Sequence, residues 1–529
     1  MKKINPITLI IIATIFFIVF GNITFFQEVL KIYPIVGFQS ALFIASLALV
    51  FTCVNIIILS MLCYKYTIKP VLITLMLISA SCAYFMDSYH VIIDTVMIDN
   101  IIKTDTGEAF DLFSIKQFLY ILFLGVLPAI WIYKVPVADQ TFKKAVLSKL
   151  SVITISLIIG VVTILSLGDF YASFLREHKS LRNYANPSYY IYSIGNYIGG
   201  LYRAENNVFT PIGLDAKISP EVPDRELIIL VVGETVRADH FSLNGYGQKT
   251  NPRLEKENII NFSNVWSCGT STAVSVPCLF GLAGKSDYDH SKAKSIGNLL
   301  DIAQHVGVNV LWLDNNSSSK GVADRVEYQS YKSPDINPVC DIECRDVGML
   351  AHLQTYIDSH PTGDILIILH QMGNHGPAYY KRYPDEFEHF KPTCKTNQLE
   401  KCSSEEINNA YDNAILYTDF FLSETINLLK NNDPNFESVL MYVSDHGESL
   451  GENGIYLHGL PYMLAPDAQK HVPMLLWFGE NIDTEEINVE KIKLKIDQEL
   501  SHDNVFHSIL GLLEIDTEVY EADLDIINN

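Results

Sequence analysis

A short loop rich in hydroxyl side chains is bracketed by two cysteines, Cys268 and Cys278. Its hydroxyl residues are Thr270, Ser271, Thr272 and Ser275. A disulfide between the two cysteines would hold one of these hydroxyls in a fixed position, as a nucleophile assisted by a metal ion requires. The loop therefore supplies four candidate nucleophiles.

Carboxylate, imidazole and amide side chains follow four apolar runs in the second half of the chain. In chain order they are Glu234, Asp314, Asn315, Asn316, His370, His375, Asp445, His446, Glu448 and His458. A single Asp–His pair is usually an ordinary surface or core pair, but four run ends that all carry such groups are unusual by chance. The pattern predicts a metal site built from loops.

The fold that would gather these groups is indicated by five short β-rich runs separated by helical stretches. The runs are 227–232, 308–313, 365–369, 439–443 and 472–477. Short apolar strands that alternate with helices predict an α/β domain with a mostly parallel sheet covered by helices on both faces. Functional residues of such sheets lie at the carboxyl ends of the strands, which places the polar groups on one edge.

The ligand types at this edge select the metal. Imidazole and carboxylate without thiolate suit zinc, or less often manganese. Zinc lowers the pKa of bound water from about 15.7 to about 7, and the same polarisation would act on a coordinated threonine or serine hydroxyl. A position at a helix N-terminus would also help to bind a phosphate under attack.

Five long apolar runs precede residue 170, at 7–26, 36–63, 70–90, 117–133 and 150–167. Most reach the roughly 20 residues that a membrane-spanning helix needs, and too few charges separate them for a series of buried core helices. The first run lacks a clear small-x-small cleavage site, which favours an uncleaved span over a signal peptide. Lysines concentrate in alternate loops, so the N-terminus is expected in the cytoplasm and residues after about 168 outside the inner membrane.

The cysteines test this topology independently. Three of them, Cys53, Cys63 and Cys82, fall within the expected spans. The other six form three local pairs, Cys268/Cys278, Cys340/Cys344 and Cys394/Cys402. Close pairs on the outer side predict three disulfides in an oxidising compartment. Zinc knuckles are the alternative, but their Cys-x2-Cys spacing is not matched.

Charge is distributed unevenly along the chain. Residues 1–225 carry 17 Lys+Arg and 14 Asp+Glu, a net charge of +3, whereas residues 226–529 carry 21 and 46, a net charge of −25. An acidic surface argues against nucleic-acid binding, because phosphate backbones need a basic partner. The excess otherwise contributes to solubility.

Two further segments are expected near the membrane surface. In the polar stretch from Tyr89 to Ala109, the residues Asn100, Thr104 and Glu108 recur at positions i, i+4 and i+8 of one helical face. This face is either a solvated stripe of an interfacial helix or a polar surface for a lipid headgroup. Residues 169–224 are rich in tyrosine and are expected to bridge along the bilayer surface.

Five motifs occur in order along the chain. They are Gly233-Glu-Thr-Val-Arg-Ala-Asp-His240, Ser267-Cys-Gly-Thr-Ser-Thr272, Asp314-Asn-Asn-Ser-Ser-Ser-Lys320, His370-Gln-Met-Gly-Asn-His-Gly-Pro377 and Ser444-Asp-His-Gly-Glu448. With these motifs the chain resembles the lipid A phosphoethanolamine transferases, and among them the mobile colistin resistance enzymes most closely. The resemblance covers nearly the whole chain. It implies five transmembrane helices and a periplasmic domain similar to alkaline phosphatase and the sulfatases.

The resemblance also implies a role for each matching residue. Thr272 matches the nucleophile, and Glu234, Asp445 and His446 match the ligands that hold one zinc ion beside it. A second zinc or phosphate site is implied for His375 and His458. Substrate contacts are implied for Asn100, Thr104, Glu108, Asn316 and Lys320, and supporting roles for Glu448 and His370. Val236 and Val274 depart from the commonest pattern, and Val274 borders the nucleophile.

The implied activity is zinc-dependent transfer of phosphoethanolamine from phosphatidylethanolamine to a lipid A phosphate through a phosphothreonine intermediate. Such an enzyme would give resistance to cationic peptides such as polymyxin and colistin. The alternatives are a related transferase or hydrolase acting on another envelope glycan or the lipopolysaccharide core, a binding protein on an inactive enzyme fold, and a transporter. The intact ligand set disfavours the binding protein, and the scarcity of intramembrane charge disfavours the transporter.

The expected protein is a monomer in the bacterial inner membrane that binds no nucleic acid. Residues 1–168 are expected to form a transmembrane domain of five helices. Residues 169–224 are expected to form the interfacial bridge, and residues 225–529 the periplasmic catalytic domain.

Overall fold

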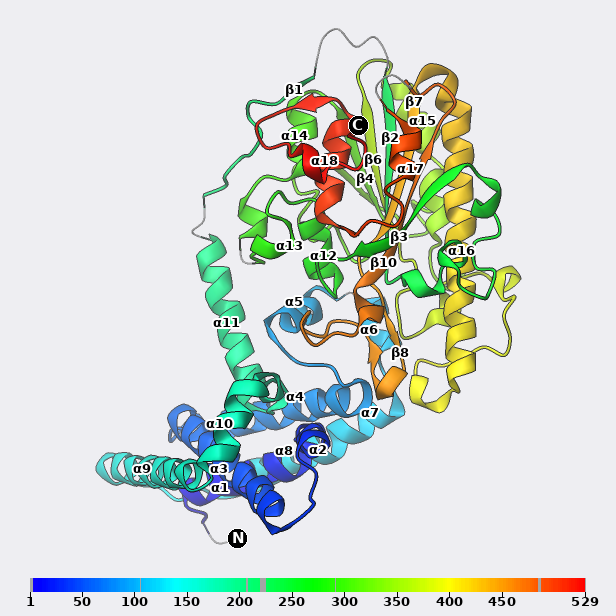
Figure 1. The fold of residues 1–529 in the computed structure, drawn as a ribbon. Coiled ribbons are helices and arrows are strands. Elements are labelled where there is room, and N and C mark those ends of the chain that lie inside the picture. The colour runs from blue at the N-terminus through cyan, green and yellow to red at the C-terminus, as the bar shows by residue number, and fades with distance from the viewer. Residues whose placement is uncertain are drawn as a thin grey trace. The chain divides into compact units, whose positions relative to one another are not determined.

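The computed structural model of this 529-residue chain describes residues 3–104, 106–205, 208–218, 225–290, 292–483 and 487–528. The chain separates into two compact units (Figure 1). The helical unit comprises Met1–Asp99 and Phe113–Ile198, and the sheet unit comprises Asn100–Leu112 and Gly199–Asn529. The domain boundaries near residues 168 and 224 remain predictions.

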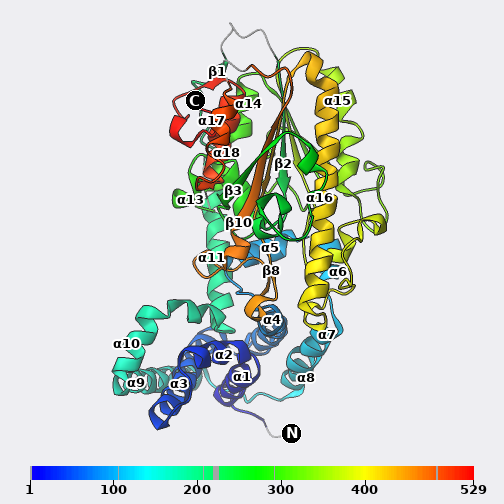
Figure 2. The same cartoon turned by 45° about the vertical axis from the view of Figure 1, so that its right-hand side comes forward.

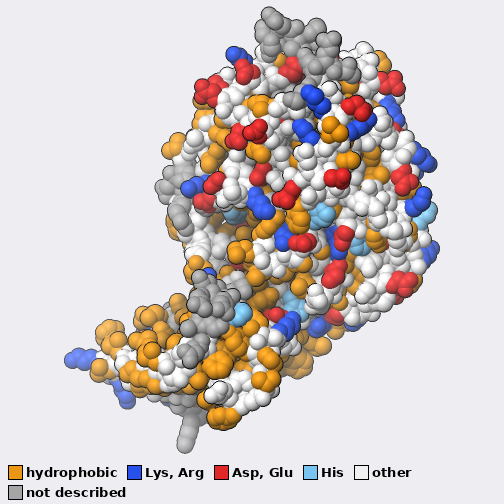
Figure 3. Space-filling view, in the orientation of Figure 1, with side chains coloured by type: hydrophobic (Ala, Val, Ile, Leu, Met, Phe, Trp, Pro, Cys, Tyr) orange, Lys and Arg blue, Asp and Glu red, His pale blue; other side chains and the backbone are white. Residues whose placement is uncertain are grey.

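Four helical segments of the helical unit are long and apolar enough to cross a membrane. They are α3 (Phe38–Leu62), α4 (Ile68–Tyr89), the segment Ile115–Lys134 and α9 (Phe142–Ser166). The third consists of α7 (Ile115–Tyr120), a π-helical turn (Ile121–Val126) and α8 (Leu127–Lys134). Only 11% of the apolar window in α9 is buried, so this unit exposes the apolar side chains seen on it in Figure 3. Such a surface suits a lipid environment.

The first apolar run does not form one straight helix. It is divided into α1 (Pro6–Phe20) and α2 (Ile23–Ile32), which are bent by 56° relative to each other. Asn22 lies at the break, and its amide donates to the Phe17 carbonyl oxygen at 2.9 Å. Its own side-chain oxygen accepts from the backbone N–H of Asn186 at 2.9 Å. Among the described residues, the helical unit thus has four helical segments that are long and apolar enough to cross a membrane, or five if the bent pair counts as one.

The polar stretch after α4 is not one continuous helix. It forms α5 (Thr95–Lys103) and α6 (Thr106–Asp111), so the single face expected for Asn100, Thr104 and Glu108 is interrupted. Thr104 lies between the two helices, where its hydroxyl donates to the Asn100 carbonyl oxygen at 2.8 Å. The side chain of Glu108 lies outside the described residues. Two further helices follow α9, namely α10 (Gly168–Glu177) and α11 (Ser188–Glu205).

The sheet unit is built on a mixed sheet of eight strands in the order β11-β3-β10-β7-β2-β6-β4-β5. The strands are β2 (Glu226–Gly233), β3 (Ile259–Trp266), β4 (Asn309–Asp314), β5 (Glu327–Ser330), β6 (Ile365–His370), β7 (Glu437–Ser444), β10 (His471–Phe478) and β11 (Leu500–Ser501). Strand β10 is antiparallel to both of its neighbours, and every other adjacent pair is parallel. The five predicted runs are therefore strands, and three more strands extend the sheet.

Helices cover both faces of this sheet, as Figure 2 shows for α14 and α18 on one side and α15 and α16 on the other. The helices of the unit outside α6 are α12 (Thr272–Leu279), α13 (Gly284–Asp287), α14 (Leu299–His305), α15 (Leu353–Ser359), α16 (Ser404–Asn432), α17 (Val489–Lys493) and α18 (Asp503–Leu512). Side chains on one face of β2, β7 and β10 pack with those of α12, α14 and α18 in one large core. All eight residues of β2 and of β7 are buried, as expected for central strands covered on both faces.

Three smaller features complete the sheet unit. Two small antiparallel pairs form, β1 (Lys217–Ile218) with β12 (Ile515–Asp516) and β8 (Ser449–Leu450) with β9 (Tyr456–Leu457). The three predicted disulfides are present, Cys268–Cys278, Cys340–Cys344 and Cys394–Cys402. The long helix α16 starts with a capping box in which Ser403 and Glu406 bond each other's backbone N–H groups.

Candidate metal centre and nucleophile

The strand register brings the predicted ligands together. Gly233 at the end of β2 is aligned with Ser444 at the end of β7, so Glu234 and Asp445 leave adjacent parallel strands at the same level. Glu234, Asp445 and His446 are all fully buried, and one ligand atom from each lies within 4.8 Å of the other two. The sheet edge therefore forms the three-residue cluster that the sequence indicates.

The hydrogen bonds of His446 define which of its nitrogens faces the cluster. Its Nδ1 lies 2.9 Å from the carbonyl oxygen of Gly447, which can only accept, so Nδ1 carries the proton. The Nε2 lone pair then lies 3.3 Å from Asp445 Oδ2 and 3.5 Å from Glu234 Oε1. Neither carboxylate oxygen has a hydrogen-bond donor among the described residues. Three electron-rich atoms that converge without a donor fit a cation between them.

The pKa shifts of the cluster also fit a bound cation. Burial raises the pKa of Asp445 well above its ordinary value, and the nearby Glu234 carboxylate adds to this rise. Burial also acts to raise the pKa of Glu234, but His446 and three other imidazoles lower it overall. Burial, with the charge of His458, lowers the pKa of His446 to about 3, so its imidazole is neutral at pH 7. Two buried carboxylates and a neutral imidazole are a donor set that fits zinc.

Thr272 is the hydroxyl that faces this cluster. It is the first residue of α12, and its Oγ1 donates to Glu234 Oε2 at 3.1 Å and lies 3.4 Å from His446 Nε2. By contrast, the hydroxyl of Thr270 donates to the Leu460 carbonyl oxygen, and that of Ser275 accepts from the backbone N–H of Gly269. Because a helix N-terminus presents unbonded N–H groups, α12 also offers donors to an anion beside Thr272.

The loop after β4 supplies the next predicted residue. The Asn316 amide donates to Glu234 Oε2 at 2.7 Å and to the Gln371 carbonyl oxygen at 2.8 Å, so it orients the carboxylate. Asp314 holds this loop, because its Oδ1 accepts from the backbone N–H of Ser318 and its Oδ2 accepts from His370 Nδ1 at 2.9 Å. His370 therefore acts on the loop through Asp314 and is not part of the three-residue cluster.

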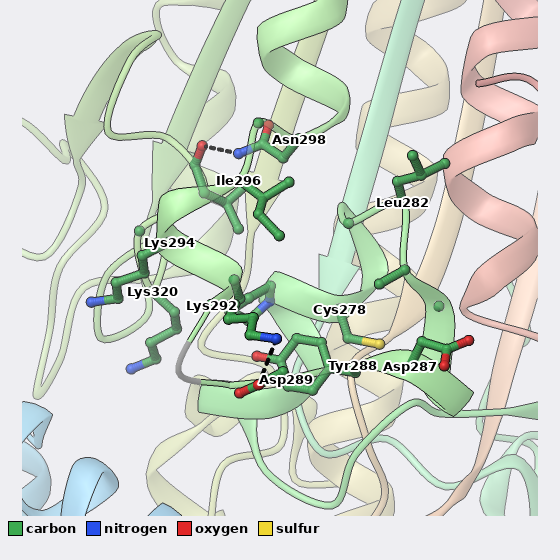
Figure 4. A pocket seen from close by; sticks show the side chains of 18 residues that line it. Cys278, Leu282, Asp287, Tyr288, Asp289, Lys292, Lys294, Ile296, Asn298 and Lys320 are labelled. Carbon is green, nitrogen blue, oxygen red and sulfur yellow. Dashed lines mark hydrogen bonds and ion pairs between the residues drawn. The ribbon is translucent and has the colours of Figure 1, made fainter. Parts of the chain in front are cut away.

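Lys320 occupies the end of the same loop. Its ammonium donates to the Ser317 hydroxyl at 2.6 Å and to the Ser317 carbonyl oxygen at 2.9 Å, and only 6% of the residue is exposed. It also lines a cavity of about 240 Å³ beside α12, together with Lys292 and Lys294 (Figure 4). In that cavity Lys292 pairs with Asp289 at 3.6 Å.

Two further predicted histidines, His458 and His375, lie in a row next to His446. The ring centres of His446 and His458 are 4.4 Å apart, and those of His458 and His375 are 5.6 Å apart. His458 Nδ1 lies 3.4 Å from the buried Glu448 carboxylate, which orients the ring as a ligand-supporting carboxylate does. The three imidazoles thus form one row that begins at the cluster.

One residue that holds the site together has no signal in the sequence. His502 is fully buried, and its Nδ1 accepts from the backbone N–H of Cys268 at 3.2 Å. Its Nε2 donates to the carbonyl oxygen of Ser444 at 2.9 Å. It therefore links the loop that carries Thr272 to the strand that delivers Asp445 and His446. An isolated histidine before a short amphipathic helix gives no indication of this role.

Two different family models match the two parts of the chain. Residues 226–515 match the model of the Sulfatase family, and residues 51–202 match that of the family described as Phosphoethanolamine transferase EptA/EptB. The sheet unit therefore has the fold of the Sulfatase family.

Relatives of nearly full length are also found. Phosphatidylethanolamine transferase Mcr-2 from Escherichia coli is 41% identical over 97% of this chain and 96% of its own length. Phosphoethanolamine transferase EptA from Escherichia coli is 39% identical over 99% and 97%.

A solved structure gives the same result. The integral membrane lipooligosaccharide phosphoethanolamine transferase A (EptA) from Neisseria meningitidis superimposes with a TM-score of 0.95. It is 34% identical, and the match covers 100% of this chain and 99% of that one. These matches, together with the buried Glu–Asp–His cluster beside a helix-terminal threonine, place the chain in the phosphoethanolamine transferase family of enzymes.

Proposed function

We propose that this enzyme transfers phosphoethanolamine from phosphatidylethanolamine to a phosphate of lipid A, with Thr272 as its nucleophile. The observation that carries the proposal is the position of Thr272 Oγ1, 3.1 Å from Glu234 Oε2 and 3.4 Å from His446 Nε2. The remaining hydroxyls of the loop are engaged elsewhere or, as Ser271, lie at the N-cap of α12. The names of the relatives support phosphoethanolamine as the transferred group.

Glu234, Asp445 and His446 would hold one zinc ion, with Thr272 as a further ligand. When bound, zinc supplies positive charge that lowers the pKa of the threonine hydroxyl and stabilises charge on the phosphate. Asn316 keeps Glu234 in place through its hydrogen bond at 2.7 Å. His375 and His458 lie beyond His446 in the same row, where they would donate hydrogen bonds to phosphate oxygens or hold a second zinc ion.

Transfer proceeds in two displacements at phosphorus. In the first, Thr272 Oγ1 bonds to phosphorus, the bond to the glycerol oxygen of the donor breaks, and that oxygen takes the threonine proton to leave as diacylglycerol. In the second, an oxygen of the lipid A phosphate bonds to the same phosphorus and the bond to Thr272 Oγ1 breaks. The proton of the acceptor phosphate monoester then restores the threonine hydroxyl.

Both substrates are membrane lipids, which gives the apolar helices a function. We place the enzyme in the bacterial inner membrane as a multi-pass protein with the sheet unit in the periplasm. A tethered enzyme meets its lipid substrates at high effective concentration and in restricted orientation. The product carries one masked negative charge per transfer, so cationic peptides such as polymyxin would bind the modified surface more weakly.

The test uses the full-length enzyme with phosphatidylethanolamine that carries an isotope-labelled headgroup. Intact-protein mass spectrometry should show one phosphoethanolamine on wild type and none on Thr272→Ala. Ser271→Ala is the matched control, since it removes the neighbouring hydroxyl and should retain the adduct. Transfer at the wild-type rate by Thr272→Ala would show that Thr272 is not the nucleophile. The mass of lipid A from cells with and without the protein tests the acceptor, for which a gain of one phosphoethanolamine is expected.

A further inference from the structure

A second, larger cavity opens from the same edge of the sheet unit. It has a volume of about 580 Å³ and begins at Asn316 and His375, which belong to the site described above. The other lining residues are Phe110, Asp111, Asn315, Ser317, Lys332, Ile342, Glu343, Cys344, Met372, Lys381 and Arg382. The cavity therefore reaches from the reaction centre to a wall that includes the end of α6.

That wall is fixed by a network of buried charges. Asp111 pairs with Lys381 and, at 3.1 Å, with Arg382, and its carbonyl oxygen accepts from the Asn397 amide. Arg382 also pairs with Glu343, and its Nε donates to the carbonyl oxygen of His375 at 2.6 Å. Only 3% of the Arg382 side chain and 10% of the Asp111 side chain are exposed. Arg382 thus connects the wall of the cavity directly to the backbone of a histidine in the reaction centre.

The chemistry of the lining indicates the ligand. Three cationic side chains, Lys332, Lys381 and Arg382, face the same space as two carboxylates, Asp111 and Glu343. A lysine ammonium has three donors, so Lys381 keeps donors for a ligand while it pairs with Asp111. Cations bind phosphate oxygens, whereas carboxylate and amide oxygens accept from hydroxyl groups. A ligand that carries both phosphate and several hydroxyls would use both sets.

We infer that this cavity binds the phosphorylated sugar headgroup of the acceptor lipid, with Lys332 and Lys381 on its phosphate and Glu343 and Asn315 on its hydroxyls. The inference rests on the proposed function, because it assigns the acceptor side of the same reaction. Phe110 offers an apolar face for the C–H groups of a sugar ring. The open end at Asn316 and His375 puts a phosphate of the bound sugar next to the group carried by Thr272.

The donor lipid fits this cavity less well. A phosphoethanolamine group alone would leave most of a 580 Å³ space unfilled. Ligand sites of roughly 300–1,000 Å³ enclose molecules of the size of one or two sugar rings.

The experiment separates the two half-reactions in the full-length enzyme. Labelled phosphatidylethanolamine reports formation of the threonine adduct, and glucosamine 1-phosphate serves as a soluble acceptor. The test variant is Lys332→Gln. The matched control is Lys430→Gln, which removes a lysine that pairs with Glu257 at 2.6 Å and does not line the cavity. Binding of glucosamine 1-phosphate without any donor is measured by calorimetry for all three proteins.

The expected result is weaker binding and slower use of the acceptor, with little change in formation of the threonine adduct. Lys332→Gln should form the adduct within about twofold of the wild-type rate, while kcat/KM for glucosamine 1-phosphate falls about tenfold, mainly through KM. Its affinity for the sugar phosphate should fall by a similar factor. Lys430→Gln should match wild type in each measurement. Wild type should bind glycerol 3-phosphate at least tenfold more weakly than glucosamine 1-phosphate, because glycerol lacks the ring.

Other outcomes would overturn the inference. An equal loss of adduct formation and transfer in Lys332→Gln would assign the cavity to the donor. Unchanged acceptor KM and affinity would show that the cavity binds no acceptor, and equal binding of the two phosphates would exclude recognition of the sugar. Failure of wild type to form an adduct would contradict the proposed function alone, because the calorimetric comparison of wild type and Lys332→Gln decides the cavity assignment without a donor.

Discussion

The side chains around His446 Nε2 are arranged to bind a cation, because this nitrogen, Glu234 Oε1 and Asp445 Oδ2 do not form hydrogen bonds with one another there. His446 Nε2 lies 3.5 Å from Glu234 Oε1 and 3.3 Å from Asp445 Oδ2, and neither carboxylate oxygen has a donor among the described residues. Leaving a buried acceptor unsatisfied costs about 1–3 kcal/mol, and more if it is charged. A bound metal ion removes this cost, so it should contribute to stability as well as to catalysis.

Metal removal should therefore destabilise the protein. With free zinc about 1,000-fold above its Kd, bound zinc contributes about 4 kcal/mol to folding, so EDTA should lower the Tm of the sheet unit by several degrees. Differential scanning calorimetry of the purified enzyme measures the change. Glu234→Gln, which lacks one ligand, should respond to EDTA much less than wild type. A wild-type Tm that is indifferent to EDTA would contradict the metal assignment.

His502 should make stability depend on pH. Burial lowers its pKa from 6.5 to about 4. Between these pH values the unfolded chain binds a proton that the folded protein does not, so stability falls as the pH drops from 6.5 to 4. The loss from this residue is on the order of 3 kcal/mol.

The variant His502→Gln isolates this contribution. A glutamine amide retains one acceptor for the Cys268 N–H and one donor for the Ser444 carbonyl oxygen, but it does not titrate. Chemical denaturation between pH 4 and pH 7 should show a flatter profile for the variant than for wild type. Parallel profiles would show that His502 does not remain neutral in the folded protein.

At this scale the sequence was most informative for residues that directly follow strands. Glu234, Asp445 and His446 could be predicted to meet because parallel strands deliver their carboxyl ends to one edge, and the structure shows them together. His502 could not, since nothing in its neighbours indicates that its two nitrogens bridge Cys268 and Ser444. The roles of Asn316, Lys320, His375 and His458 in substrate binding stay predictions.

Among the elements, α12 determines the position of Thr272, the proposed nucleophile. The Cys268–Cys278 disulfide joins the residue before the loop to the last turn of this helix. Thr270 connects the same loop to the segment that carries His458, because its hydroxyl donates to the Leu460 carbonyl oxygen and its own carbonyl oxygen accepts from the Gly459 N–H. The loop that leads into α12 is thus held by the disulfide and by two hydrogen bonds to residues 459 and 460.

Removal of this disulfide should reduce activity more than removal of another of similar span. Chain entropy assigns about 3 kcal/mol to a bridge that closes a loop of this order. The double variant Cys268→Ser/Cys278→Ser should lower kcat by about tenfold or more, since Thr272 loses its fixed position.

The matched control is Cys394→Ser/Cys402→Ser, whose bridge spans 8 residues against 10 for the first. It should lose a similar amount of stability and keep most of its kcat. Adduct formation and thermal unfolding measure the two effects. Equal losses of kcat in both double variants would show that the bridge near Thr272 contributes only stability.

The direction of β10, the presence of β3 and the bend between α1 and α2 cannot be predicted from local sequence pattern. Strand β10 was expected from its apolar run, but a run of this kind does not reveal direction, and β10 is the reversed strand of the sheet. Strand β3 was missed because its half-buried sequence contains Asn261, Ser263 and Asn264. The bend between α1 and α2 depends on the hydrogen bonds of Asn22 with Asn186, which is far away in sequence.

For the molecule as a whole, the most consequential feature is the membership of Asn100–Leu112 in the sheet unit. This segment lies between two apolar helices in sequence, yet Asp111 pairs with Lys381 and Arg382, about 270 residues further along. No periodicity or motif connects residues at such a distance. The composition predicts an apolar membrane part and a folded outer part. It does not predict that residues 100–112, which lie between two apolar helices in sequence, belong to the sheet unit.

The ion pairs of Asp111 should be detectable by hydrogen–deuterium exchange. In Asp111→Ala, backbone amides of residues 375–382 should exchange about tenfold faster or more, because breaking a buried pair leaves charges unpaired at a cost of about 3–5 kcal/mol. Helix α18, which packs against α12, α14 and β11, serves as the internal reference and should not change. Asp139→Ala removes the exposed pair with Lys65 and should leave residues 375–382 unaffected. Unchanged exchange in Asp111→Ala would show that the segment is not held by these pairs.

The depth of Thr272 has a consequence for the fate of the reaction. Only 7% of this residue is exposed, and it lies at the start of a helix enclosed by the ligand cluster. A group esterified to its oxygen would be shielded from bulk water on most sides. Hydrolysis of that ester would consume a donor lipid without any transfer. The longer the shielded ester survives, the lower the concentration of acceptor lipid at which the enzyme can still complete the transfer.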